Sequence, residues 1–349
     1  VYGVPDKRVI ETTVGRVVFN EIWPPELGFF NRVAGKGPLG ELIWNCYQVA
    51  GHEATVASLD ALKELGFREA TQAGISIGIE DMIIPSEKQQ TIAEAHRIFT
   101  AVDRPNVMIK VPATKPGIEA IRRLISDGIN VNVTLIFALD RYTDVMEAYL
   151  GGLEDRRSQG KDVDGIASVA SFFVSRVDTS VDRLLNEKIG ETEDPRDKKA
   201  LEELLGKAAV ANAKLAYVLF EELFSGPRWE TLAAAGARPQ RPLWASTGTK
   251  NPNYPDTLYV DTLIGPYTIN TMPNKTIQAF LDHGTVKRTV DSDIEQAKNV
   301  LIDLEAAGIS IDAVTAQLET EGIDSFIKSF ETLLAGVEGK RAALTAAAD

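Results

Sequence analysis

The main pattern in the chain is a series of short apolar runs that alternate with longer segments of helical spacing. Five runs stand out: Val107–Val111, Val131–Phe137, Ile166–Val174, Pro242–Ser246 and Tyr267–Met272. Strands that are apolar along their whole length are typical of parallel sheets with helices on both faces. From about residue 91 onward, the pattern therefore predicts a partial (β/α)8 barrel with about five βα units.

Between and after these runs, apolar residues recur every three or four positions, which predicts helices. The predicted helices are Pro116–Asp127, Leu139–Gly151, Thr179–Lys188, Asp197–Leu223, Asp291–Ala307 and Ile323–Val337. In such barrels the chemistry lies at the carboxyl ends of the strands. We therefore expect the functional residues in the last positions of the strands and just after them.

The first ninety residues differ in composition and pattern, with frequent Gly and Pro and short apolar patches. They predict an irregular α+β segment. Val and Thr are frequent over Glu11–Glu21, which predicts a strand, and Ile75–Ile84 predicts a strand or an extended loop. Helical spacing predicts helices over Gly40–Ala50 and Glu53–Leu65, the second with Leu59, Leu62 and Leu65 on one stripe.

Composition narrows the class of protein. The chain has 349 residues and a net charge of −13, so we expect no independent binding to nucleic acid. Its one cysteine, Cys46, cannot form an internal disulfide, which favours a reducing, cytoplasmic location. We expect no membrane span, because no apolar run approaches the ~20 residues required. The three histidines are scattered, so we expect no metal site.

Lys110 lies inside an apolar run, between Ile109 and Val111. Burial disfavours the ammonium form, and a neutral amine attacks carbonyl groups to form an imine. The alternative is a lysine at the end of a strand whose amine reaches solvent. Asn132 and Thr134 alternate along the next run, so both side chains face the same way.

Other polar residues follow later runs. Ser171 lies within the third run, and Arg176 comes just after it. Ser246 and Lys250 lie at and after the end of the fourth run. Two cations near strand ends favour a phosphate site, although Arg176 alone is equally typical of a surface ion pair.

Five segments together resemble the successive signatures of bacterial transaldolases: NVMIKVPATKPGIEAI, GINVNVTLIF, SVASFFVSRVD, LWASTGTKNP and NTMP. The resemblance runs from about Thr91 to Val337. It implies that Lys110 forms a Schiff base with a ketose phosphate, that Asn132 binds the dihydroxyacetone unit and that Thr134 helps to hold the catalytic water. It also implies a set of residues that line the pocket or bind phosphate: Ser171, Phe173, Arg176, Ser246 and Lys250.

The implied reaction transfers a dihydroxyacetone unit between sugar phosphates, such as sedoheptulose 7-phosphate and glyceraldehyde 3-phosphate, in the pentose phosphate pathway. The lysine itself serves as the electron sink, so the resemblance implies no metal and no organic cofactor. It fixes no oligomeric state.

A second resemblance covers the start of the chain. TTVGRVVFNEIWP, LDALKELGFREAT and AGISIGIEDMIIPSEK resemble a segment of the bacterial RNA polymerase β′ subunit. That segment lacks the metal-binding aspartate motif of the subunit. We therefore interpret the chain as a chimera, with a polymerase-like segment over residues 1–92 and a transaldolase-like barrel portion over residues 93–349.

The chain also departs from the transaldolase pattern. Transaldolases carry three further strands before the lysine strand, with an Asp, an Asn and a Glu in patterns like LDDLSR, TSNP and LEVSP. The residues before Lys110 contain none of these patterns. We therefore expect impaired turnover. Two alternatives stay open: a non-catalytic fragment of DNA-directed RNA polymerase β′, or another Schiff-base aldolase.

Overall fold

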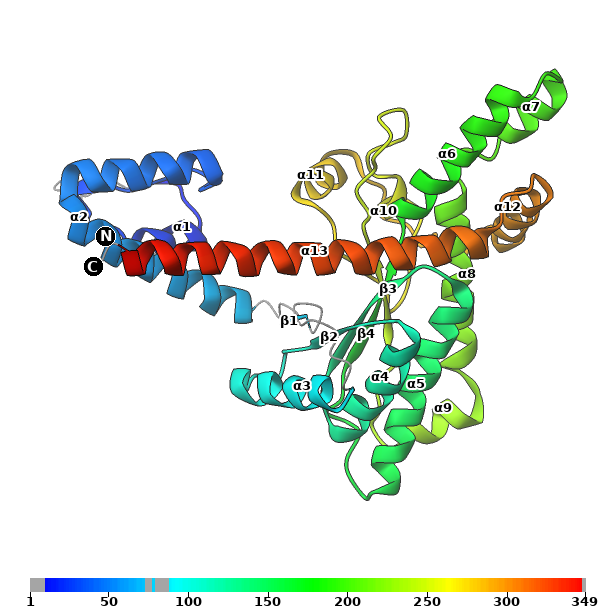
Figure 1. Ribbon diagram of the computed structural model, residues 1–349, viewed down its shortest axis with the longest axis horizontal. Coiled ribbons are helices and arrows are strands. Elements are labelled where there is room, and N and C mark those ends of the chain that lie inside the picture. Colours follow the sequence, from blue (N-terminus) through cyan, green and yellow to red (C-terminus); the bar gives the residue numbers. More distant parts are fainter. Residues whose placement is uncertain (1–9, 73–76, 79–87, 347–349) are drawn as a thin grey trace. The chain divides into compact units, whose positions relative to one another are not determined.

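The computed structural model describes residues 10–72, 77–78 and 88–346. The chain divides into two compact units, Val1–Ile75 and Ser76–Asp349. Figure 1 colours both units along the sequence. Each unit is described by itself below.

Among the described residues of the first unit, the regular elements are all helices. Helix α1 spans Val14–Asn20, a short 3-10 helix spans Pro25–Leu27, and α2 spans Lys36–Gln72. The strand predicted over Glu11–Glu21 is therefore wrong. The Thr13 hydroxyl accepts a hydrogen bond from the Arg16 amide at 3.3 Å, and this cap starts a helix where the Val-rich composition had favoured a strand.

Helix α2 confirms the two predicted helices, Gly40–Ala50 and Glu53–Leu65, and joins them across Gly51. Gly51 has φ of 81°, a value that glycine adopts without strain, and it bends the chain there. A small core of Trp23, Leu42 and Cys46 holds this unit together.

The second unit contains a parallel sheet whose strands follow one another in sequence order. The described strands are β1 (Ile77–Gly78), β2 (Ile109–Pro112), β3 (Val131–Ile136), β4 (Ser168–Phe173), β5 (Arg241–Ala245) and β6 (Ile269–Asn270). All five predicted runs are strands. Within the strand or loop predicted over Ile75–Ile84, β1 confirms a strand at two positions, and the other positions lie outside the described residues.

Helices connect the strands and cover the sheet (Figure 1). They are α3 (Lys88–Val102), α4 (Lys115–Asp127), α5 (Leu139–Ser158), α6 (Ser175–Glu191), α7 (Pro195–Glu202), α8 (Ala208–Leu223), α9 (Gly226–Ala233), α10 (Leu258–Asp261), α11 (Asn274–His283), α12 (Ile294–Ala306) and α13 (Ile311–Ala346). The arrangement is the partial parallel α/β barrel that the apolar runs predict. Among the described residues, no helix has both the length and the apolar composition needed to cross a membrane.

The prediction of one helix over Asp197–Leu223 is wrong, because the segment forms α7 and α8 with a turn between them. Gly206 in that turn has φ of 70°. Its amide donates to the carboxylate of Asp182 on α6, and the Ala209 amide donates to Asp178. These amides bind carboxylates in place of carbonyl oxygens of a continuous helix, and α8 begins anew beyond the turn.

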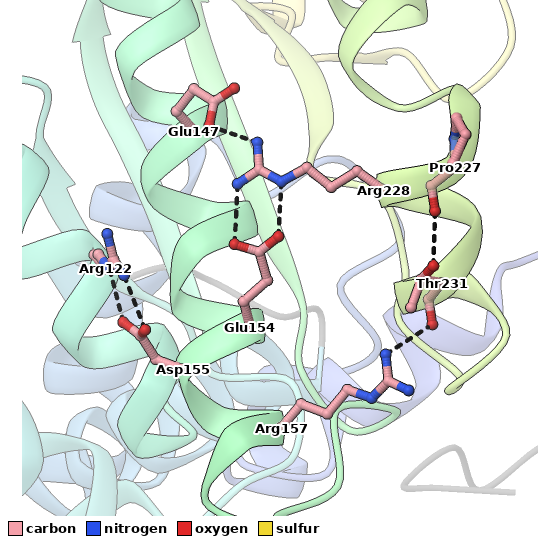
Figure 2. Close-up of polar contacts among 8 residues, drawn as sticks. All are labelled: Arg122, Glu147, Glu154, Asp155, Arg157, Pro227, Arg228 and Thr231. Carbon is pink, nitrogen blue, oxygen red and sulfur yellow. Dashed lines mark hydrogen bonds and ion pairs between the residues drawn. The ribbon is translucent and has the colours of Figure 1, made fainter.

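On the outside of the unit, charged pairs join α5 to two neighbouring helices, α4 and α9 (Figure 2). The Arg228 guanidinium of α9 donates to Glu147 at 2.7 Å and to Glu154 at 2.7 and 3.0 Å. Arg122 of α4 makes two bonds, of 2.6 and 2.8 Å, to Asp155. These side chains are partly exposed, so each pair contributes little stability, roughly 0–1 kcal/mol.

Candidate active site

Lys110 occupies the second position of β2 and is half-buried. In the parallel ladder it lies opposite Asn132, and Pro112 lies opposite Thr134. The Lys110 Nζ is 5.5 Å from the centroid of the Phe326 ring, which comes from α13. A cation over an aromatic face is attracted by the ring quadrupole. The lysine therefore contacts an apolar side chain more than two hundred residues further along the chain.

Asn132 and Ser171 meet across β3 and β4. The Ser171 hydroxyl donates to Asn132 Oδ1 at 2.8 Å, and both side chains are buried. Asn132 is also the registered neighbour of Lys110. The structure therefore brings together three of the residues that the sequence singled out, on three successive strands.

The Thr134 side chain is fully buried, and its Oγ1 has no hydrogen-bond partner among the described residues. A buried hydroxyl of this kind is uncommon, because leaving it unpaired is costly. The next residue, Leu135, has φ of 58° at a break in the pairing between β3 and β4. Such bulges and left-handed residues are frequent beside active sites.

Helix α13 lies against this bulge. Gly322 of α13 packs so closely on Leu135 that a Cβ at Gly322 would lie 2.8 Å from Leu135 Cδ2. Gly322 and Phe326 are four residues apart and lie on one face of the helix. One face of α13 therefore contacts both β3 and the Lys110 amine.

The ends of β4 and β5 are joined by two serines. Ser175 and Ser246 share a hydrogen bond of 2.9 Å between their hydroxyls, and the Ser175 amide donates to the Ser246 carbonyl at 3.0 Å. Ser246 has φ of 56°, a left-handed conformation that is uncommon for serine. The two connections that follow β4 and β5 are therefore held side by side at their start.

Arg176 and Lys250 lie on these two connections. Arg176 is exposed in the first turn of α6, and its guanidinium carbon is 5.3 Å from the centroid of the Phe173 ring. Lys250 is exposed, four residues after Ser246. The structure thus places the predicted cations on adjacent connections at the carboxyl end of the sheet, and both side chains are exposed.

Three residues near this site were not singled out from the sequence. Phe326 lies within the predicted helix Ile323–Val337, and no local pattern connects it with Lys110. Asp178 and Asp182 lie one turn apart on α6 among buried residues such as Val177 and Val181. Two acidic residues at helical spacing inside an apolar stripe were a usable signal for a buried polar cluster.

Comparison with known families gives two matches. A family model described as Transaldolase/Fructose-6-phosphate aldolase matches residues 67–337. A model described as RNA polymerase Rpb1, domain 3, matches residues 2–82. Both resemblances inferred from the sequence are confirmed, and the two matches overlap over residues 67–82.

Curated relatives agree with the first match. A transaldolase of Saccharopolyspora erythraea is 49% identical over 273 residues, which cover 77% of this chain and 72% of the relative. A transaldolase of Thermobifida fusca is 51% identical over 269 residues, covering 76% and 70%. Transaldolase 1 of Streptomyces avermitilis is 44% identical over 336 residues, covering 96% and 86%. The chain therefore belongs to the transaldolase/fructose-6-phosphate aldolase family of enzymes.

Proposed function

We propose that this chain is a Schiff-base transaldolase in which Lys110 bonds covalently to a ketose phosphate. The Lys110 Nζ attacks the carbonyl carbon, and the carbonyl oxygen leaves as water, so that a protonated imine forms. The adjacent carbon–carbon bond then breaks, and its electron pair moves into the imine to give an enamine. Water accepts the proton of the hydroxyl group on the departing carbon, and that fragment leaves as an aldehyde.

The second half reverses these steps on another sugar. The enamine carbon attacks the aldehyde of an acceptor sugar phosphate, and water then hydrolyses the imine to release the product and the free amine. Because the imine itself accepts the electron pair, the reaction requires neither a metal nor an organic cofactor. Such an enzyme of sugar phosphate metabolism would act in the cytoplasm.

One observation carries this proposal: Lys110 lies in an apolar strand beside Asn132, whose amide oxygen is already held by Ser171. That bond fixes the orientation of the Asn132 amide, and the proposed substrate contact is a hydrogen bond from its nitrogen to a substrate oxygen. The Thr134 hydroxyl, which bonds to none of the described residues, supports a role in holding the water that hydrolyses the imine.

The phosphate end of the substrate would lie across the connections that follow β4 and β5. Arg176, Ser246 and Lys250 supply two positive charges and one hydroxyl there, a set suited to phosphate oxygens. Phe173, whose ring packs under Arg176, would form the apolar wall between the phosphate and the imine.

The test is borohydride trapping of the imine with fructose 6-phosphate, followed by intact-mass measurement. The parent chain should gain one reduced sugar phosphate adduct, and Lys110→Ala should gain none. Lys161→Ala is the matched control, because Lys161 is an exposed lysine of the same unit. An adduct that survives in Lys110→Ala would assign the imine to another lysine and overturn the proposal.

A further inference from the structure

Two buried aspartates of α6 have matching sets of partners. Asp178 is 2% exposed, and its two oxygens accept from the Ala209 amide and the Tyr259 hydroxyl, both at 2.7 Å. Asp182, one turn later, accepts from the Gly206 amide at 2.9 Å and from the Tyr254 hydroxyl at 2.7 Å. Each carboxylate therefore joins one amide near the start of α8 to one tyrosine that follows β5.

The packing around this cluster is close. At Gly206, which has φ of 70°, a Cβ would lie 2.7 Å from the Tyr254 ring. Tyr259 is buried within α10. The tyrosines therefore cannot move away from α6 without breaking both a hydrogen bond to a carboxylate and a packed contact.

The cluster of Asp178, Asp182 and the two tyrosines lies close along the chain to both cations of the candidate phosphate site. Arg176 lies two residues before Asp178 in the first turn of α6. Lys250 lies four residues before Tyr254, in a stretch between β5 and α10 that contains no helix or strand. Such a stretch depends on side-chain bonds for a fixed conformation.

We propose that Asp178 and Asp182, acting through Tyr259 and Tyr254, are positioning residues that hold the two cation-bearing connections at the spacing needed to bind a sugar phosphate. This inference rests on the proposed function. Recognition of one phosphate by two cations on separate segments requires both segments to be ordered before binding, because ordering them on binding weakens affinity.

The test uses tyrosine variants, which remove one hydroxyl and keep the ring. Tyr254→Phe and Tyr259→Phe each delete a bond to a buried carboxylate. Tyr149→Phe is the matched control: the buried Tyr149 of α5 also donates one hydrogen bond of 2.7 Å, but to the Arg238 carbonyl before the start of β5, at the opposite end of the sheet. Equal losses of melting temperature would show that the three changes are comparable in the fold.

Imine trapping at Lys110 is then measured with two sugars, one with and one without phosphate. For Tyr254→Phe we expect the half-saturating concentration of fructose 6-phosphate to rise about tenfold. Trapping with dihydroxyacetone should be unchanged, and Tyr149→Phe should behave as the parent with both sugars. An equal loss with both sugars would mean that the tyrosines serve only the fold, and this would overturn the inference.

A parent chain that traps neither sugar would refute the imine proposal, and binding of inorganic phosphate, measured by calorimetry, then decides the inference by itself. Tyr254→Phe should bind phosphate about tenfold more weakly than the parent and the Tyr149→Phe control. Equal affinities, or no binding to the parent chain, would overturn it.

Discussion

At the scale of single residues, the buried hydroxyl of Thr134 gives a clear prediction about stability and imine hydrolysis. Its hydroxyl has no partner among the described residues, so Thr134→Val, which replaces the hydroxyl with a methyl group, should keep or raise the free energy of unfolding, by roughly 1 kcal/mol. The same variant should slow hydrolysis of the imine. Urea denaturation and the rate of adduct release measure the two effects.

Thr247→Val provides the contrast for stability, because the equally buried Thr247 hydroxyl donates to Asn270 Oδ1 at 2.7 Å. That change removes the donor to the Asn270 oxygen and should cost about 1–2 kcal/mol. If both variants lost the same stability, the Thr134 hydroxyl would make a stabilising hydrogen bond in solution, as the Thr247 hydroxyl does, and the stability prediction for Thr134→Val would be wrong.

Asp178 makes a prediction about pH. Burial raises the pKa of its carboxyl from 3.8 to about 6, against the opposing hydrogen bonds from Ala209 and Tyr259, and the nearby Asp182 carboxylate raises it further. The folded state therefore holds the proton more tightly than the unfolded state. The contribution of this group to stability falls as pH rises from about 4 to about 6, and is constant above that range.

The measurement compares the parent with Asp178→Asn, which has no carboxyl to titrate at this position. Between pH 4 and pH 7 the parent should lose stability relative to the variant, on the order of 3 kcal/mol. Other carboxylates titrate in both proteins and cancel in the difference. A difference that does not change with pH would show that Asp178 titrates at its ordinary pKa.

The sequence predicted part of this site for a definite reason. Lys110, Asn132 and Thr134 are polar positions inside apolar strands, and alternation along a strand indicates which of them share a face. Phe326 contacts Lys110 through α13. Such a contact depends on where a distant helix packs, and no local spacing encodes it.

At the scale of elements, the packing of α5 on α4 depends on Gly152. A Cβ there would lie 2.7 Å from the Arg122 carbonyl oxygen and 2.8 Å from Ile125 Cβ, so backbone would have to move. Gly152→Ala should therefore destabilise the fold by about 1–3 kcal/mol despite the higher helix propensity of alanine. Thermal unfolding followed by circular dichroism measures this loss.

Gly190 of α6 is the matched control, because no atom lies within 4 Å of a Cβ placed there. Gly190→Ala should leave stability unchanged or raise it by up to about 1 kcal/mol. Should Gly152→Ala prove equally neutral, α4 and α5 would be separated more widely in solution than the structure places them.

Elements with a strong hydrophobic periodicity could be predicted from the sequence. Elements whose bounds depend on caps and turns were predicted less well. The five apolar strands were found because burial on both faces leaves an unbroken apolar run. The helix α1 was missed because a single cap at Thr13 outweighs the strand preference of valine. The break between α7 and α8 depends on amides that bind Asp178 and Asp182, which are distant in sequence.

At the scale of the whole molecule, two family matches share one chain. The polymerase match ends at residue 82 and the transaldolase match begins at residue 67, while the compact units divide between Ile75 and Ser76. The boundary at residue 92 was inferred from the change in composition and pattern and from the two sets of motifs, and it stays a prediction. A change in composition locates a boundary only roughly, because the helices on both sides of this one have similar composition.

This organisation predicts that the chain forms the imine at Lys110 but transfers the dihydroxyacetone unit slowly. In the proposed mechanism, Lys110, Asn132 and Ser171, which lie together on three strands, serve the first step. The residues before Lys110 contain none of the carboxylate patterns with which transaldolases move protons during carbon–carbon cleavage. A missing general acid–base group costs about 10²–10⁴-fold in rate.

We therefore expect borohydride trapping at a rate close to that of the Thermobifida fusca relative, together with transfer between sedoheptulose 7-phosphate and glyceraldehyde 3-phosphate that is about 10²–10⁴-fold slower. Both rates are measured on both proteins at equal concentration. Transfer as fast as in the relative would mean that carboxylates elsewhere in this chain move the protons. Glu80 and Asp81, which precede the lysine strand and lie outside the described residues, would then be the first to replace with Gln and Asn.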